Sequence, residues 1–239
     1  MLVGKGIVKS FGKLQILHGI DIEVHPGKIT AIVGPSGSGK STLLRILSLL
    51  DAADSGTVSI DGVAYGVPQR GPAPSPPWPA LTVVFQQLFL WPHLTLRTNV
   101  ELPLRGASGS SELVESLVEE FDLARLMDRY PNEVSLGQRQ RAALIRAIAL
   151  RPKYLLLDEI TSALDIEHVS RVLSCLSRVQ KEGTGILLVT HLIGFAQRSA
   201  DNVVFIENGS VLESGGPSIL VSPSNERLRQ FLSLVETAS

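Results

Sequence analysis

The sequence has only one cysteine, Cys175, among its 239 residues, and this excludes an internal disulfide. It also lacks a run of about 20 apolar residues, the length that a membrane-spanning helix needs, and its first residues lack the apolar region of a signal peptide. Neither sign of charge dominates, because 22 basic residues face 23 acidic ones. We therefore expect a protein of a reducing compartment such as the cytosol, with no nucleic-acid partner.

Short strand-like runs alternate with helical patterns along the chain, which predicts an α/β fold. Apolar runs at 28–34, 154–157 and 186–189 end in glycine or polar residues, as buried parallel strands do where their carboxyl ends meet a site. Near the end of the chain, two short apolar runs flank Asn208 and Gly209. This pair favours a tight antiparallel hairpin at the edge of the sheet.

Three segments repeat apolar residues at helical spacing. One predicted helix spans 111–130 and is stopped by Pro131. Another carries Cys175 on its apolar face, which predicts a buried, unreactive thiol. A third follows the first strand, and its expected inner face consists of Leu43, Leu44, Ile46, Leu47 and Leu50.

Two stretches are expected to be loops. Residues 66–80 hold six of the 14 prolines, which favours an exposed, partly extended connector over a segment that docks into a proline-binding groove of a partner. Residues 86–98 are unusually apolar for a loop that contains Pro92. Core packing is the simplest explanation of this stretch, and an exposed docking patch is the alternative.

A glycine-rich segment follows the first predicted strand. It fits the phosphate-binding pattern of a glycine, four residues and then Gly-Lys-Ser, placed between a strand and a helix. Backbone N–H groups of such a loop surround phosphate oxygens, Lys40 reaches the terminal phosphates, and Ser41 can ligate Mg²⁺. The segment therefore predicts nucleoside triphosphate binding, in preference to a glycine-rich turn without a ligand. The expected nucleotide contacts are Gly34, Ser36, Gly37, Ser38, Gly39, Lys40, Ser41 and Thr42.

Two adjacent acids, Asp158 and Glu159, come directly after the predicted strand 154–157. A buried carboxylate without a partner costs free energy, and a metal ion removes that cost. We expect Asp158 to hold Mg²⁺, directly or through water, and Glu159 to act as the general base that polarises an attacking water. A helix-capping acid pair is the alternative, but a phosphate-binding segment needs a magnesium partner.

Six features of the sequence together resemble the motifs of one known family. They occur in the family's order: an aromatic residue at Phe11, the phosphate-binding segment, a glutamine at Gln86, the segment 135–138, the acids followed by 162–165, and His191. The chain resembles an ATP-binding subunit of an ATP-binding cassette (ABC) transporter over nearly all of its length. Within that family, the stretches 84–87, 91–95 and 231–232 most resemble those of the polar amino acid uptake group.

The resemblance implies roles for residues outside the phosphate-binding segment. By this resemblance Phe11 stacks on adenine, while Gln86 and His191 take part in catalysis and Gln86 also contacts the metal. A lone histidine after a strand is otherwise usually a satisfied polar residue, and the other four histidines show no metal-ligand spacing.

The segment 135–138 has both a structural and a functional interpretation. Ser135 and Gln138 form the S-x-x-Q pattern of a capping box, which predicts the start of a helix. A helix N-terminus with a serine and a glycine is also an anion site, and the resemblance implies that Ser135, Gly137 and Gln138 bind the γ-phosphate held by an opposing subunit. It also places Asp165 at the contact between the two subunits.

The family's organisation supplies the expected fold and partners. The fold is a P-loop NTPase (RecA-like) α/β core with an antiparallel β-subdomain and an inserted helical subdomain. One domain, 1–239, would comprise a nucleotide-binding core at 1–86 and 151–220, a helical subdomain at 87–150 and a C-terminal helix at 221–239. The cofactors would be ATP and Mg²⁺. The partners would be transmembrane permease subunits, a second ATP-binding subunit in a homodimer and, indirectly, a solute-binding protein, with the chain peripheral at the cytoplasmic face of the inner membrane.

Three features depart from the family pattern. One is the proline-rich segment 66–80, which replaces a usually ordinary strand-bearing segment. Leu136 stands where the family usually has glycine, and Ile160 where it usually has proline. If position 136 requires a positive φ, leucine strains the segment by about 1 to 3 kcal/mol and slows hydrolysis. The alternatives are therefore a nucleotide-dependent dimerisation or regulatory module with weak hydrolysis, or an ABC ATPase of another import or export system. An ABC ATPase of a soluble machine and a nucleotide kinase explain fewer of the motifs.

Overall fold

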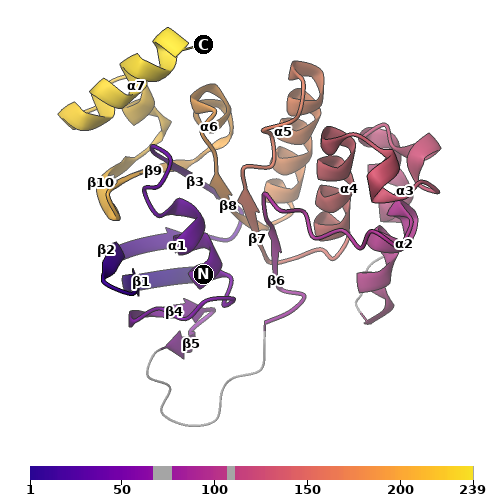
Figure 1. The fold of residues 1–239 in the computed structure, drawn as a ribbon, viewed down its shortest axis with the longest axis horizontal. Coiled ribbons are helices and arrows are strands. Elements are labelled where there is room, and N and C mark those ends of the chain that lie inside the picture. Colours follow the sequence, from indigo (N-terminus) through magenta and orange to yellow (C-terminus); the bar gives the residue numbers. More distant parts are fainter. Residues whose placement is uncertain (67–76, 107–110, 239) are drawn as a thin grey trace.

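The computed structural model describes residues 1–66, 77–106 and 111–238, whose strands form two sheets (Figure 1). The larger sheet has six strands in the order β10-β9-β3-β8-β7-β6, and all neighbours are parallel except β10 and β9. The strands of this sheet are β3 (Ile29–Val33), β6 (Leu81–Val84), β7 (Tyr154–Asp158), β8 (Gly185–Val189), β9 (Asn202–Glu207) and β10 (Ser210–Gly215).

The second sheet is antiparallel, with the strand order β2-β1-β4-β5. Its strands are β1 (Leu2–Phe11), β2 (Leu14–Val24), β4 (Ser55–Ile60) and β5 (Val63–Gly66). Helix α1 (Lys40–Leu47) shares one hydrophobic cluster with strands of both sheets. The α/β fold class and the antiparallel β-subdomain expected from the sequence are therefore confirmed.

The remaining helices lie along the other face of the six-stranded sheet and beyond its β6 edge (Figure 1). Adjacent residues of a strand point to opposite faces, so Leu156 packs with α1 whereas Leu155 packs with α4 and α5. Short 3-10 turns occur at Leu102–Gly106, Ala124–Leu126, Pro131–Glu133 and Pro217–Leu220. The helices are α2 (Leu96–Glu101), α3 (Ser111–Glu120), α4 (Leu136–Ile148), α5 (Ile166–Lys181), α6 (Ile193–Ser199) and α7 (Glu226–Ala238).

The predicted strands and the hairpin are confirmed. β3, β7 and β8 are buried along their whole length, as expected for central parallel strands. Asn208 and Gly209 connect β9 to β10 with φ angles of 47° and 71°. Cys175 is buried on α5, and burial raises the pKa of its thiol to about 12, which agrees with an unreactive cysteine.

The helix predicted over 111–130 is wrong in its length, because α3 ends at Glu120. Asp122 has a left-handed φ of 52°, and the N–H of Leu123 donates to the carbonyl of Val118 at 2.9 Å. This bond closes the helix end well before Pro131. Leu123 is fully buried just after the turn, so the chain gains a core contact where the helix stops.

The expected inner face of α1 is correct except at Leu50. The four residues from Leu43 to Leu47 that were assigned to this face are buried. Leu50 is mostly exposed, because the helix ends at Leu47 and Leu49 takes a φ of 62° that turns the chain away.

The proline-rich segment predicted over 66–80 lies mostly outside the described residues. Its last part, 77–80, is described and leads into β6. The apolar stretch 86–98 is not a loop throughout, because Thr95 caps α2 by accepting a hydrogen bond from the N–H of Thr98. Within the described ranges, no helix is both long and apolar enough to cross a membrane. The proposed division into core, helical subdomain and C-terminal helix stays a prediction.

Candidate active site

The phosphate-binding segment runs from the end of β3 into the first turn of α1, the strand-to-helix context expected for it. Gly34, Gly37 and Gly39 all have positive φ, which explains why glycine is needed there. Lys40 is 7% exposed, and its ammonium donates to the carbonyl oxygens of Gly34 at 2.9 Å and Pro35 at 2.7 Å. The lysine is therefore folded back over the loop that it follows.

Strands β9 and β2 pack closely against this loop. A β-carbon added at Gly34 would overlap the carbonyl oxygen of Ile206 in β9, and one at Gly39 would lie 2.7 Å from Leu17 in β2. The turn after β9 also contacts the loop, because the N–H of Gly209 donates to the carbonyl of Ser38 at 3.2 Å. The sequence identified this turn, but nothing in its pattern indicates contact with the phosphate loop.

Asp158 ends β7 beside the loop and is 4% exposed. The hydroxyl of Ser41 donates to its Oδ1 at 3.3 Å. Burial raises the pKa of Asp158, and the charge of Glu159 adds to this, against the opposing effects of Ser41 and Lys40. Burial also lowers the pKa of Lys40, although Glu159 and Asp158 oppose this. The fold thus holds an anion and a cation that it solvates poorly.

The oxygen atoms at this position suit Mg²⁺. The Ser41 hydroxyl and the Asp158 carboxylate are hard oxygen donors that already lie together. Among the described residues, no group of three or more His, Cys, Asp and Glu side chains lies close enough to hold a metal by itself. Mg²⁺ commonly takes one or two protein ligands and completes its shell with water and phosphate oxygens, so this donor set fits that ion.

Three further predicted residues meet at the carboxyl ends of adjacent parallel strands. Gln86 follows β6, Glu159 follows β7 and His191 follows β8. The side-chain amide of Gln86 donates to Glu159 Oε2 at 3.3 Å, and Nδ1 of His191 lies 3.7 Å from Glu159 Oε1. Glu159 has a left-handed φ of 50°, and its N–H donates to the carbonyl of Val189 at 2.9 Å. The structure therefore places Gln86 and His191 on either oxygen of the Glu159 carboxylate.

The segment 135–138 forms the predicted start of a helix. Ser135 caps α4 and accepts from the N–H of Gln138 at 3.3 Å, while the Gln138 side chain accepts from the N–H of Ser135 at 2.8 Å. Leu136 is the first helical residue, 47% exposed, and is not among the residues with positive φ. The backbone strain considered for leucine at this position is therefore absent.

Phe11 and Asp165 lie apart from the grouped residues. Phe11 is 55% exposed at the end of β1, with the ammonium of Lys9 5.4 Å from its ring centre. Asp165 caps α5 by accepting from the N–H of His168 at 2.9 Å, and this hydrogen bond lowers the pKa of Asp165. In the described part of the chain, no hydrogen bond joins segment 135–138 to the phosphate loop.

One buried residue beside the site was missed from the sequence. Gln140 of α4 contacts Ser162 and Ala163 through both of its side-chain polar atoms. Its position next to segment 135–138 is the signal that could have drawn attention to it. A glutamine in an amphipathic helix is usually solvent-exposed, so the sequence alone gives no reason to expect burial.

Comparison with known proteins finds relatives along almost the whole chain. The family model described as "ABC transporter" matches residues 17–162. The glutamine transport ATP-binding protein of Escherichia coli is 41% identical over 244 residues, which cover 97% of this chain and 98% of the relative. The glutamate transport ATP-binding protein of Corynebacterium glutamicum is 40% identical over 238 residues, with the same two shares.

Solved structures show the same similarity. A dimeric ATP-binding cassette in a post-hydrolysis state, bound to ADP and Pi, matches with a TM-score of 0.81 and 30% identity, over 91% of this chain and 99% of that one. A second match, an ATP-binding subunit of an ABC transporter, has a TM-score of 0.84 at 24% identity and covers 98% of this chain. The latter supports the fold alone.

Proposed function

The chain belongs to the ABC transporter family and is an ATP-hydrolysing subunit of it, and from this premise we propose that it drives the transport of an amino acid across a membrane. The substrate class is supported by the relatives, which are glutamine and glutamate transport proteins. A regulatory module with weak hydrolysis is not favoured, because Leu136 shows no left-handed backbone strain.

The observation that carries the proposal is the convergence of charged and polar groups at one end of the parallel strands. Lys40 and Asp158 are buried beside the phosphate loop, and Glu159 lies between Gln86 and His191. Such an arrangement suits phosphoryl transfer, which depends on positioning and on stabilising charge rather than on a covalent intermediate.

We assign the nucleotide contacts to the chain's own groups. The phosphate loop would bind the phosphates through its backbone N–H groups, and Lys40 would pair with the terminal ones. Burial disfavours the charged form of Lys40, and anionic phosphates would stabilise that form. Nucleotide binding would therefore favour protonation of the lysine, and protonation would favour nucleotide binding. Phe11 would offer its exposed ring to the adenine.

Ser41, Asp158 and Gln86 would hold Mg²⁺, which supplies neutralisation of phosphate charge when it is bound. Glu159 would accept a proton from the attacking water, with its carboxylate oriented by Gln86 and His191. The distances of 3.3 and 3.7 Å from these two residues to Glu159 support this orientation. In this scheme His191 would also contact the γ-phosphate and sense whether ATP is intact.

A second ATP-binding subunit would complete each site. Ser135, Gly137 and Gln138 lie at a helix N-terminus at which Ser135 is exposed and the other two are partly exposed. Such a position suits an anion brought by another molecule. Asp165 would lie at the same contact. The dimeric ATP-binding cassette among the matched structures supports pairing of two such chains. In a closed twofold dimer with head-to-tail pairing, segment 135–138 of each chain would face the nucleotide site of the other.

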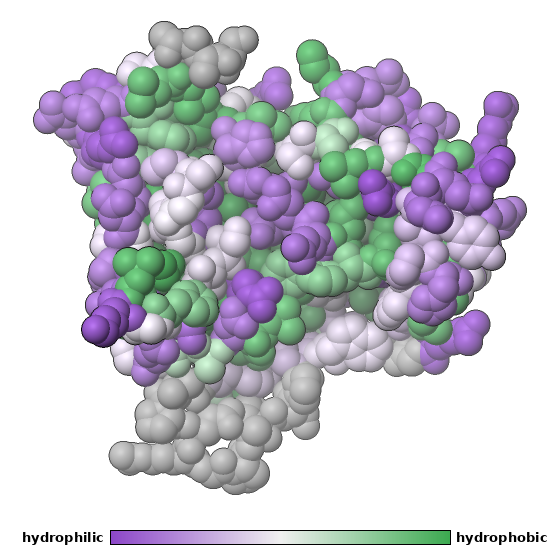
Figure 2. Space-filling model, in the orientation of Figure 1, coloured by the Kyte–Doolittle hydropathy of each residue, from purple (hydrophilic) through white to green (hydrophobic). Residues whose placement is uncertain are grey.

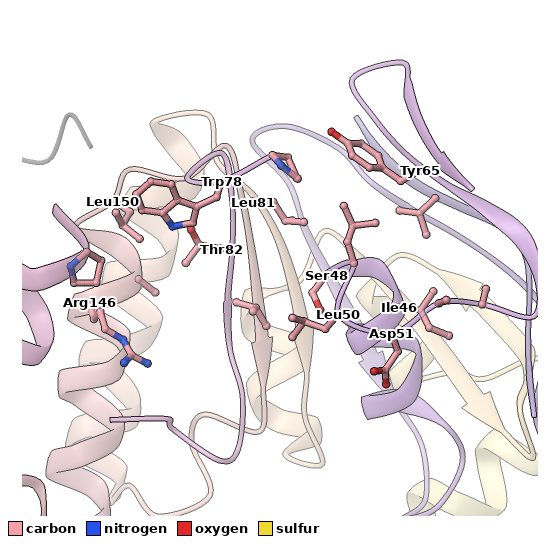
Figure 3. Close-up of a pocket in the computed structure, with 18 of the residues that line it drawn as sticks. Ile46, Ser48, Leu50, Asp51, Tyr65, Trp78, Leu81, Thr82, Arg146 and Leu150 are labelled. Atoms are coloured by element: carbon pink, nitrogen blue, oxygen red, sulfur yellow. The ribbon is translucent and has the colours of Figure 1, made fainter. Parts of the chain in front are cut away.

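The permease subunit would dock in the pocket of Figure 3, which has a volume of about 960 Å³. Its two sides come from different parts of the fold. Arg146 of α4, with Leu150 and Trp78 beside it, faces Ile46 of α1 and Tyr65 of β5 across the pocket. Trp91, from the stretch after Gln86, also lines it. The position supports communication between a membrane subunit and the nucleotide.

Docking to a permease would place the chain peripherally at the cytoplasmic face of the inner membrane. Figure 2 shows hydrophilic and hydrophobic side chains interspersed over one face of the molecule, which suits a peripheral protein better than an embedded one. A solute-binding protein would be an indirect partner that delivers the amino acid to the permease.

The deciding experiment compares Mg-ATP hydrolysis by the purified chain with hydrolysis by Glu159→Gln, while light scattering follows dimerisation. Loss of the general base should lower hydrolysis by about 100-fold or more and leave ATP binding intact, so that an ATP-bound dimer accumulates. Glu112→Gln, an exposed acid on α3, is the matched control and should hydrolyse normally. Unchanged turnover in Glu159→Gln would refute the role of the glutamate.

A further inference from the structure

Gln140 connects helix α4 to the segment that follows Glu159. It is 3% exposed, its Nε2 donates to Oγ of Ser162 at 3.1 Å, and its Oε1 accepts from the N–H of Ala163 at 3.3 Å. A backbone N–H can only donate, so this second bond fixes which end of the amide faces Ala163. Both ends of one side chain are thus committed to two neighbouring residues.

The same helix also touches this segment with its backbone. A β-carbon added at Gly137 would lie 2.7 Å from the carbonyl oxygen of Ala163 and 3.4 Å from Leu164. Gly137 and Gln140 are three residues apart and therefore lie on one face of α4. The first turn of α4 and segment 162–164 are accordingly packed without space for another atom.

Segment 162–164 is in turn attached to the catalytic carboxylate's own backbone. The N–H of Ser162 donates to the carbonyl of Glu159 at 3.4 Å, and the N–H of Leu164 donates to that of Thr161 at 3.2 Å. These bonds form a compact turn after a glutamate whose φ is left-handed. A displacement of Ser162 would therefore also displace the backbone of Glu159, which lies three residues earlier in the chain.

We propose that Gln140 is a positioning residue that holds the turn 159–163 in register with the first turn of α4. One side chain thereby positions two parts of the chain. The first is segment 135–138, which faces the partner's nucleotide, and the second is Glu159, which belongs to the chain's own nucleotide site. The inference rests on the proposed function and adds to it a link, within one chain, between two different ATP sites of the dimer.

The test compares Gln140→Met, Ser162→Ala and the double variant. Methionine keeps the volume and cannot bond to either partner, and Ser162 is exposed, so Ser162→Ala keeps the fold even where the core substitution does not. We expect kcat for ATP hydrolysis to fall about tenfold in Gln140→Met and less in Ser162→Ala, with KM for ATP within about twofold of the parent value. Ser170→Ala, an exposed serine of α5, is the matched control.

The double variant shows whether the two residues act through one contact. If they do, Ser162→Ala has no further effect on kcat once Gln140 is methionine. A folded Gln140→Met protein with normal kcat, or one that only loses thermal stability, overturns the positioning role. Failure of the proposed function would look different, because the unsubstituted chain itself would then not hydrolyse ATP.

Discussion

The two segments assigned to phosphate are built in opposite ways. The loop that ends in Lys40 lies between β2 and β9, where β-carbons at two of its glycines would overlap neighbouring atoms. The segment that begins at Ser135 is a helix start that packs on Ala163 at Gly137, while its Ser135 and Leu136 are exposed. One segment is enclosed by its own chain, and the other faces outward.

The phosphate loop and segment 135–138 also differ in charge. Beside the loop, burial lowers the pKa of Lys40 and raises that of Asp158, so both charges would gain from a ligand that pairs with them. The segment 135–138 contains no charged residue, and its capping box satisfies the N–H groups of Ser135 and Gln138. We infer that affinity for ATP belongs to the first segment, and that the second contributes only after a nucleotide is in place.

In this comparison of the two segments, the largest effect expected is a loss of nucleotide affinity in Lys40→Ala. A hydrogen bond with a charged group contributes about 1.5 to 3 kcal/mol, so affinity should fall by about 10- to 100-fold. Calorimetric titration with ATP measures this. Lys5→Ala, which removes an exposed lysine of β1, is the control for charge and should bind ATP as the parent does. Intact affinity in Lys40→Ala would mean that the loop is wrongly assigned.

The enclosed segment was also the more predictable one. Its glycine pattern, the flanking strand and helix, and the acids after β7 are all local in the sequence, and the structure places them together. The contacts that hold it were not predictable, because Ile206 and Gly209 lie about 170 residues away along the chain. Apolar periodicity indicates which face of a strand is buried, but not which distant turn packs on a loop.

Element ends were predicted less well than element types. The 111–130 pattern is apolar at the correct spacing, yet α3 stops at Glu120 because burial of Leu123 favours a left-handed turn at Asp122. That competition is tertiary and leaves no mark in a local pattern. Gln140 was missed for a related reason, since only the position of Ser162 explains why a glutamine is buried there.

A smaller effect is expected on stability in Asp158→Asn. Because the pKa of Asp158 is raised in the folded chain, its ionised form opposes folding, and the contribution of Asp158 to stability is lost as pH rises through the folded pKa. At pH 7 and without nucleotide, asparagine should therefore raise the free energy of unfolding, by about 1 kcal/mol. The gain should shrink toward acid pH, below the ordinary aspartate pKa near 3.8.

Thermal unfolding at several pH values, with and without Mg-ATP, measures both sides of this effect. With Mg-ATP the order should reverse, because the parent carboxylate gains a cation that asparagine binds less well. Ser41→Ala is the companion variant, since it removes the hydrogen bond to Asp158 and should lower stability without nucleotide. A parent chain that is more stable than Asp158→Asn at pH 7 in the absence of ligand would contradict the assigned cost of the buried charge.

The smallest effect is expected from Leu136→Gly, on the outward-facing segment. Leu136 is the first residue of α4 and shows no positive φ, so glycine brings no relief of strain and costs about 0.5 kcal/mol of stability through its backbone freedom. Hydrolysis should stay within about twofold of the parent rate, which corresponds to less than about 0.5 kcal/mol in the barrier. Leu136→Ala separates the two possible causes of a larger change, because it removes the side chain without freeing the backbone. A large rise in hydrolysis in both variants would show that the exposed leucine obstructs the partner, whereas a rise in the glycine variant alone would show that pairing demands a backbone conformation that the unpaired chain does not have.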